Sequence, residues 1–133
     1  ETIYESTFTN IYFDEHNKLF VVERNLPREL PDDEFKREFL GWRDAILKHK
    51  PRKQLVDNRK YEYTILPEMQ DWINEHVLRP SFESGLAFVA FVVPEDIFAE
   101  VSISQTMEER EGKNFTLRYF HDYEKARLWL LNQ

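Results

Sequence analysis

The chain has 133 residues, of which 41% are hydrophobic and 32% are charged. This composition is that of an ordinary globular protein, and the length predicts one domain over residues 1–133. The sequence has no Cys, which excludes a disulfide framework, a zinc–thiolate site and a thiol nucleophile. The formal net charge of −7 argues against a protein that binds nucleic acids.

Neither a membrane span nor a secretory signal is visible in the sequence. The longest uninterrupted apolar run, residues 86–93, is far shorter than the roughly 18 residues that a membrane-spanning helix needs. Residues 1–10 lack both the basic head and the apolar stretch of a secretory signal. We therefore expect a cytoplasmic protein with no membrane span.

The first expected elements are two short strands. Residues 10–13 and 19–23 are rich in β-branched and aromatic side chains, and they flank a polar connector of hairpin length. Further along the chain, three more segments have strand composition. These segments are residues 54–57, 86–93 and 115–120. Residues 86–93 are apolar throughout, which is typical of a strand that is covered on both faces of its sheet.

Helix starts share one pattern, in which an apolar residue is followed by Pro and then by an acid. Pro fits the first helical turn, and carboxylates there favour the positive end of the helix dipole. This pattern predicts helices that begin near Pro31, Pro67 and Pro94, and Asp122 predicts a fourth as its N-cap. Helical spacing predicts the buried stripes Phe35, Phe39, Trp42, Ile46; Met69, Trp72, Ile73, Val77; Ile97, Phe98, Val101; and Tyr123, Ala126, Leu130.

The resulting element order is β-β-α-β-α-β-α-β-α. Strands that alternate with helices imply right-handed crossovers and parallel strands, while the leading hairpin adds antiparallel pairing. We expect an α/β fold with a single mixed, mostly parallel sheet. The edge strands of such a sheet are exposed, and two copies of the chain could form a homodimer by pairing there.

The candidate site is the polar and aromatic loop that follows the strand at residues 54–57. Open α/β sheets bind ligands at the carboxyl ends of their parallel strands. The loop contains the candidate binding residues Asp57, Asn58, Arg59, Tyr61, Tyr63 and Thr64. We expect the two tyrosines to anchor a partner and the polar residues to orient it. Alternatively, Asp57 caps the loop or pairs with Arg59, and the tyrosines cover the edge of the core.

No catalytic constellation is recognisable. The four His residues lack the spacing of a metal site, and there is neither a Gly-rich phosphate loop nor a Gly-x-Ser-x-Gly elbow. We therefore expect a non-catalytic protein without a metal or cofactor. A hydrolase or isomerase that uses Asp57 or Glu95 together with Tyr63 is the enzymatic alternative.

Several segments together resemble the STAS-like family, the fold of anti-sigma-factor antagonists, in its uncharacterised bacterial branch. The resemblance rests on the leading hairpin, on residues 55–57 and 86–93, and on the closing run from Phe120 to Leu130. It implies a regulatory domain that binds a protein partner. In the antagonists a Ser after the Asp-tipped strand is phosphorylated; here Thr64 stands in that region. Related bacterial domains also resemble the lipid-carrying CRAL-TRIO group.

Two functional hypotheses follow. The first is a non-catalytic protein-interaction or regulatory module of STAS-like type, with the loop after Asp57 as its binding surface. The second is a carrier of a small apolar ligand or lipid, with a pocket beneath the third helix that is lined by Phe98, Val101 and Trp72. This second hypothesis is based on the large number of aromatic residues, which a densely packed core would explain equally well.

Overall fold

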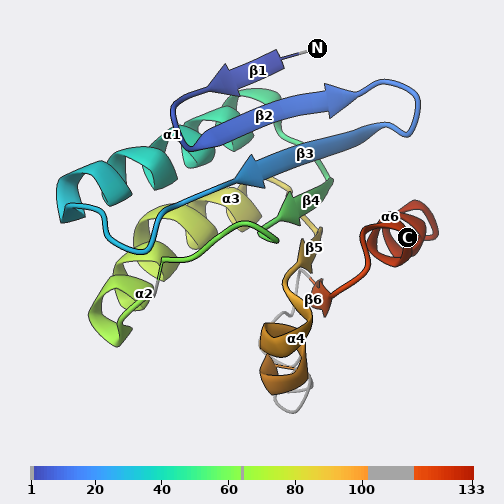
Figure 1. Cartoon of the computed structure of the whole chain (residues 1–133). Helices are drawn as coiled ribbons and strands as arrows, with labels where there is room; N and C mark the ends of the chain where they lie inside the picture. Colours follow the sequence, from blue (N-terminus) through green and yellow to red (C-terminus); the bar gives the residue numbers. More distant parts are fainter. Residues whose placement is uncertain (1, 64, 102–115) are drawn as a thin grey trace.

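The fold is a six-stranded mixed sheet with helices on both faces, seen in the computed structural model in Figure 1, which describes residues 2–63, 65–101 and 116–133. The strands are β1 (Thr2–Glu5), β2 (Thr9–Asp14), β3 (Leu19–Arg24), β4 (Lys53–Asp57), β5 (Phe88–Val92) and β6 (Thr116–Phe120). They lie side by side in chain order. The first two pairs are antiparallel and the last three are parallel, which confirms the predicted α/β class and the mixed, mostly parallel sheet.

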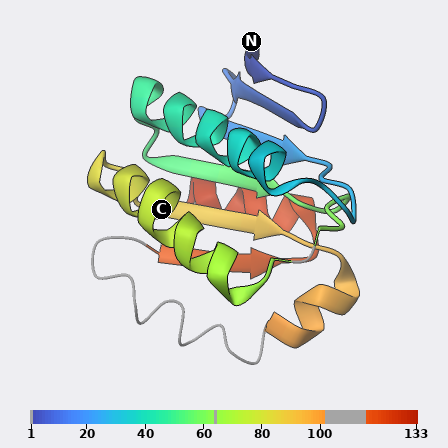
Figure 2. The ribbon, with the colours of Figure 1, turned by 90° about the vertical axis from the view of Figure 1, so that its left-hand side faces the viewer.

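The helices divide unequally between the two faces. They are α1 (Asp32–His49), α2 (Pro67–Ile73), the π-helical segment η1 (Asn74–Leu78), α3 (Arg79–Glu83), α4 (Glu95–Val101) and α6 (Tyr123–Leu131). The segments α2, η1 and α3 follow one another without a break, so residues 67–83 form one helix. This helix and α1 cover one face of the sheet, and α6 lies behind the opposite face (Figure 2). None of the helices in the described part of the chain has the length and apolar character that a membrane span requires.

Successive side chains of each strand point to opposite faces of the sheet, so a hydrophobic core forms on each face. Val22 and Val56 point toward α1 and the helix at residues 67–83, whereas Val21 and Leu55 point toward α6, where they meet Leu130. All five side chains are at most 1% exposed. At roughly 25 cal/mol per Å² of apolar surface removed from water, this two-sided burial is the main force that holds the sheet and helices together.

The predicted helix starts are confirmed. Pro31 immediately precedes α1, Pro67 opens α2, and α4 begins directly after Pro94. Asp122 is the N-cap of α6, where its carboxylate accepts a hydrogen bond from the backbone N–H of Lys125 at 3.1 Å. The predicted stripe of α1 is buried as expected.

One predicted stripe is partly wrong. Ile97 was expected to be buried, but it is 41% exposed. The short helix α4 lies beyond the carboxyl end of β5 (Figure 1), where the sheet covers less of it. Phe98 supplies the contact instead, with its ring 4.8 Å from that of His121. The side chain of Val101 and the expected strand residue Phe115 lie outside the described residues.

Strand β1 was not predicted. It pairs with β2 and carries Tyr4, whose ring lies against α1 at Gly41. A Cβ atom at Gly41 would come within 2.5 Å of the Tyr4 hydroxyl oxygen, so the absence of a side chain there is what lets the tyrosine ring approach the helix.

The π-helical segment has a local cause in Pro80. A proline inside a helix has no N–H, and its ring collides with the carbonyl four residues earlier, here that of His76. The chain widens by one residue, so that the N–H of Arg79 binds the carbonyl of Asn74, five residues back. The His76 carbonyl is not left unpaired, because it accepts a hydrogen bond from Nη1 of Arg43 in α1 at 3.3 Å.

Candidate functional site

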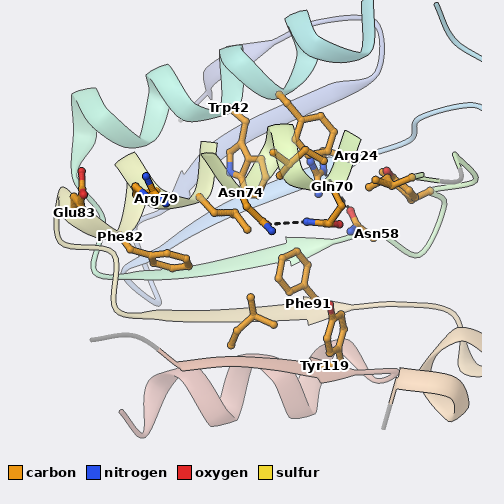
Figure 3. Close-up of a pocket in the computed structure, with 16 residues that line it drawn as sticks. Arg24, Trp42, Asn58, Gln70, Asn74, Arg79, Phe82, Glu83, Phe91 and Tyr119 are labelled. Carbon is orange, nitrogen blue, oxygen red and sulfur yellow. Dashed lines mark hydrogen bonds between the residues drawn. The ribbon is translucent and has the colours of Figure 1, made fainter. Parts of the chain in front are cut away.

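A cavity of about 880 Å³ lies between the sheet and the helix at residues 67–83 (Figure 3). Its floor is formed by Phe91 of β5 and by Leu117 and Tyr119 of β6, and the rings of Phe91 and Tyr119 are stacked with centroids 5.4 Å apart. Its inner end is at the carboxyl end of β3 and β4, where Arg24 and Asn58 lie. Cavities of this size commonly hold drug-sized ligands, and the carboxyl ends of parallel strands are a common place for them.

The roof of the cavity comes from the helix at residues 67–83. It contributes Gln70, Ile73, Asn74, Leu78, Arg79, Phe82 and Glu83. Four of these residues, Gln70, Asn74, Leu78 and Phe82, follow one another at intervals of four residues and so lie along one side of the helix. Val77, the neighbour of Leu78 in the chain, faces the core.

Arg24 is the most unusual residue of the site. It ends β3 and is only 3% exposed. Its guanidinium carbon is 4.4 Å from the ring centroids of both Phe39 and Trp42, and 5.6 Å from that of Tyr61. Its Nε donates a long hydrogen bond of 3.4 Å to Oδ1 of Asn58. These rings and this amide hold the guanidinium at the inner end of the cavity.

Burial changes the acidity of two groups at this end. The loss of solvation lowers the pKa of Arg24 to about 10, so its guanidinium still carries a charge at neutral pH. Burial also raises the pKa of Tyr61 to about 12, so the phenol is protonated there. Both groups can therefore act as hydrogen-bond donors at physiological pH.

The predicted loop is divided between the two faces of the sheet. Asp57 lies on the α6 face, in register with Glu23 and Val92. Its carboxylate accepts hydrogen bonds from Nε and Nη2 of Arg59 at 2.9 and 2.8 Å, and the Arg59 guanidinium lies 5.1 Å from the ring of Tyr123. These two residues form a surface ion pair beside the start of α6.

The remaining described loop residues lie on the cavity face. Asn58 and Tyr61 line the cavity, whereas Tyr63 stacks on Phe35 of α1 with ring centroids 4.6 Å apart. Both tyrosines are half-buried and pack against the core. Thr64 lies outside the described residues. The structure therefore brings Asn58 and Tyr61 together at one site and separates them from Asp57 and Arg59.

Most cavity residues were not singled out from the sequence. Arg24 could have been, because strand alternation places it on the same inward face as Phe20 and Val22. A charged residue in that position is a signal for a site, since an isolated buried charge is costly. Phe91 and Leu117 carry no such signal, because apolar strand residues usually belong to the core.

The pocket predicted beneath the third helix does not coincide with this cavity. Trp72 lies 5.2 Å from the ring of His76, and Phe98 faces His121; neither lines the cavity. The pair considered for catalysis is also separated, since Asp57 faces α6 and Tyr63 faces α1. Glu95 is exposed in the first turn of α4.

The described residues contain no cluster of three or more metal-binding side chains. Comparison with protein-family models, with curated proteins and with solved structures gave no significant match. The functional conclusion therefore rests on the cavity and its residues.

Proposed function

We propose that this chain is a binding module for a small organic molecule, which occupies the cavity between the sheet and the helix at residues 67–83. The observation that carries the proposal is a cavity of about 880 Å³ lined mainly by aromatic and aliphatic side chains, with Arg24, Asn58 and Tyr61 together at its inner end. An apolar cavity with a few convergent polar groups is the usual form of a ligand site.

The floor of the cavity suits a flat or elongated ligand body. Phe91, Leu117 and Tyr119 offer an apolar surface. On the roof, Nε2 of Gln70 donates a hydrogen bond to Oδ1 of Asn74 at 2.9 Å. A ligand that lies between this floor and this roof would exchange water-exposed apolar surface for contacts with both.

The lining favours binding over catalysis. Among the described lining residues the one carboxylate is Glu83, and it lies at the end of the cavity away from Arg24 (Figure 3). General acid–base catalysis by two carboxyl groups would need a second one within reach of the same bond. We therefore propose a non-catalytic carrier or sensor, which is a form of the second sequence hypothesis with its pocket in a different place.

A fluorescent probe tests this proposal directly. N-Phenyl-1-naphthylamine is neutral and aromatic, and its emission rises in apolar sites. We expect saturable binding to the wild-type chain and a loss of at least about tenfold in affinity for Leu117→Trp, which fills the floor. The matched control is Leu128→Trp on the outer side of α6, where Leu128 is 47% exposed. Absent binding to the wild type, or equal binding to Leu117→Trp, would refute the proposal.

A STAS-like regulatory module that binds a protein is the second candidate. Its support is the resemblance in element order together with the outer side of α6, where Leu128 and Leu131 are 47% and 37% exposed. Exposed leucines three residues apart on a helix suit a protein contact. Sedimentation equilibrium of wild type and Leu128→Lys tests for self-association through this side. A monomer in both cases would exclude a homodimer there.

A further inference from the structure

We propose that the ligand of this cavity is an organic monoanion, such as a carboxylate or sulfonate on an aromatic or aliphatic body, and that its charged group binds Arg24 and Tyr61 at the inner end. This inference rests on the proposed function and adds the charge and orientation of the ligand. It is carried by two buried polar atoms at that end, Nη1 of Arg24 and Oη of Tyr61, which have no hydrogen-bond partner among the described residues.

The charge of Arg24 is not matched by a carboxylate in direct contact within the described part of the chain. The charge of buried Glu38 acts on it, but Oε1 of Glu38 accepts hydrogen bonds from the hydroxyls of Ser6 and Thr9 at 2.7 and 2.6 Å. The partners found for the guanidinium are three aromatic rings and the side-chain amide of Asn58. Rings offset part of the cost of burying a cation, but they do not accept its N–H bonds in the plane of the guanidinium.

The two unpartnered atoms have the chemistry of an anion site. Nη1 of Arg24 is a charged donor, and the hydroxyl of Tyr61 is a neutral donor. Hydrogen bonds from an arginine to an anion are among the strongest that proteins make. Buried donors without partners are rare in folded proteins, and an acceptor that reaches this end of the cavity would supply the partner that they lack.

The position of these donors sets the orientation of the ligand. Arg24 lies at the inner end of the cavity, whereas Arg79 and Glu83 lie at the other end (Figure 3). The ring of Tyr61 is beside Arg24, 5.6 Å from its guanidinium carbon. Between the two ends are the stacked rings of Phe91 and Tyr119 on the floor. The charged group would therefore lie at Arg24, and the apolar body would extend over the floor toward Phe82. Among the described lining residues Arg24 is the one cation at this end, which favours a monoanion over a phosphate monoester.

Two probes that share one aromatic body test the inference. N-Phenyl-1-naphthylamine is neutral, and 8-anilinonaphthalene-1-sulfonate is the same molecule with one sulfonate. We expect the wild-type chain to bind the sulfonate about tenfold more tightly than the neutral probe, because one charged hydrogen bond is worth about that factor. Arg24→Met should abolish the preference while it retains binding of the neutral probe. Arg59→Met is the matched control, since Arg59 lies on the other face, and it should keep the preference.

A second variant keeps the test decisive if Arg24→Met does not fold. Tyr61→Phe removes only an unpartnered hydroxyl, so it should fold at least as well as the wild type and bind the sulfonate several-fold more weakly. Its affinity for the neutral probe should not change. A merely structural tyrosine would affect both probes equally.

The outcomes separate the two proposals. Equal affinity of the wild type for both probes would overturn the anion inference and leave the proposed function standing. If neither probe binds, the proposed function itself fails. A preference that Arg59→Met abolishes as fully as Arg24→Met would also overturn the inference, because it would reflect the overall charge of the protein.

Discussion

Asp57 and Asn58 are neighbours in the chain, yet their side chains serve opposite faces of the sheet. The carboxylate of Asp57 pairs with Arg59 beside α6, and the amide oxygen of Asn58 accepts a hydrogen bond from Arg24 at the cavity. This division follows from strand geometry, because successive side chains of an extended segment point to opposite sides. Mutations can therefore test the Asp57 side and the Asn58 side of the loop independently.

The Asp57 side of the loop should be dispensable for ligand binding. Asp57→Asn weakens an ion pair in which the Arg59 side chain is 50% exposed, so we expect the free energy of unfolding to fall by less than about 1 kcal/mol. Urea unfolding measures this change, and titration with the sulfonate probe should give the wild-type affinity. Asn58→Ala is the comparison that should weaken sulfonate binding. The reverse pattern would place the site on the α6 face.

Gly41 should show a substitution effect that depends on Tyr4. Gly41→Ala gains about 1 kcal/mol of helix propensity in α1, but the new methyl group displaces the Tyr4 ring and loses its packing, worth about 1.5–3 kcal/mol. We expect a net loss of stability in the wild-type background. In the Tyr4→Ala background the same substitution should stabilise the chain. Thermal unfolding of the four variants measures the coupling, and a stabilising effect in both backgrounds would show that β1 does not pack on α1.

The buried hydrogen bond between Trp42 and Gln54 should contribute measurably to the free energy of unfolding. Nε1 of Trp42 donates to Oε1 of Gln54 at 2.7 Å, and Gln54 is fully buried. Gln54→Leu leaves the indole N–H without a partner in the core, which should cost about 1–3 kcal/mol of unfolding free energy. Trp42→Phe combined with Gln54→Leu should be less destabilising than the two single changes added together. Strict additivity in chemical denaturation would contradict a coupled pair.

Tyr61 should make stability depend on pH in the alkaline range. Because burial raises its pKa to about 12 from 10.0, the unfolded chain loses this proton before the folded chain does. The folded state therefore binds more protons between these values, and the free energy of unfolding falls as the pH rises through that window. Tyr61→Phe should show a shallower decline from about pH 10 to pH 12. Identical slopes for both proteins would show that the phenol is not buried.

Local signals explain how much of the fold the sequence predicted. A Pro followed by an acid, or an Asp at an N-cap, determines a helix start within a single turn, and all four starts are confirmed. The five predicted strands likewise have local composition and alternation. Strand β1 was missed because it has only four residues and lies at an edge of the sheet, so its composition gives a short signal.

The candidate site was harder to predict because it combines residues from five strands and helices. The sequence indicated the loop after β4 as a candidate site, but it could not show that the side chains of Asp57 and Asn58 point to opposite faces of the sheet or that Tyr63 stacks on Phe35. The π turn was also missed, although Pro80 inside the second helix is its physical cause. Arg24, a charged residue on the inward face of its strand, was the one strong indication of the site that the sequence prediction did not use.

The most direct measurement of the central claim is an isotope-filtered NOE experiment on the wild-type chain saturated with N-phenyl-1-naphthylamine. The account predicts NOEs from the probe to the methyl groups of Ile73, Leu78 and Leu117, which line the cavity from both sides. NOEs confined to Leu128 and Leu131 on the outer side of α6, or none from a saturated sample, would contradict it.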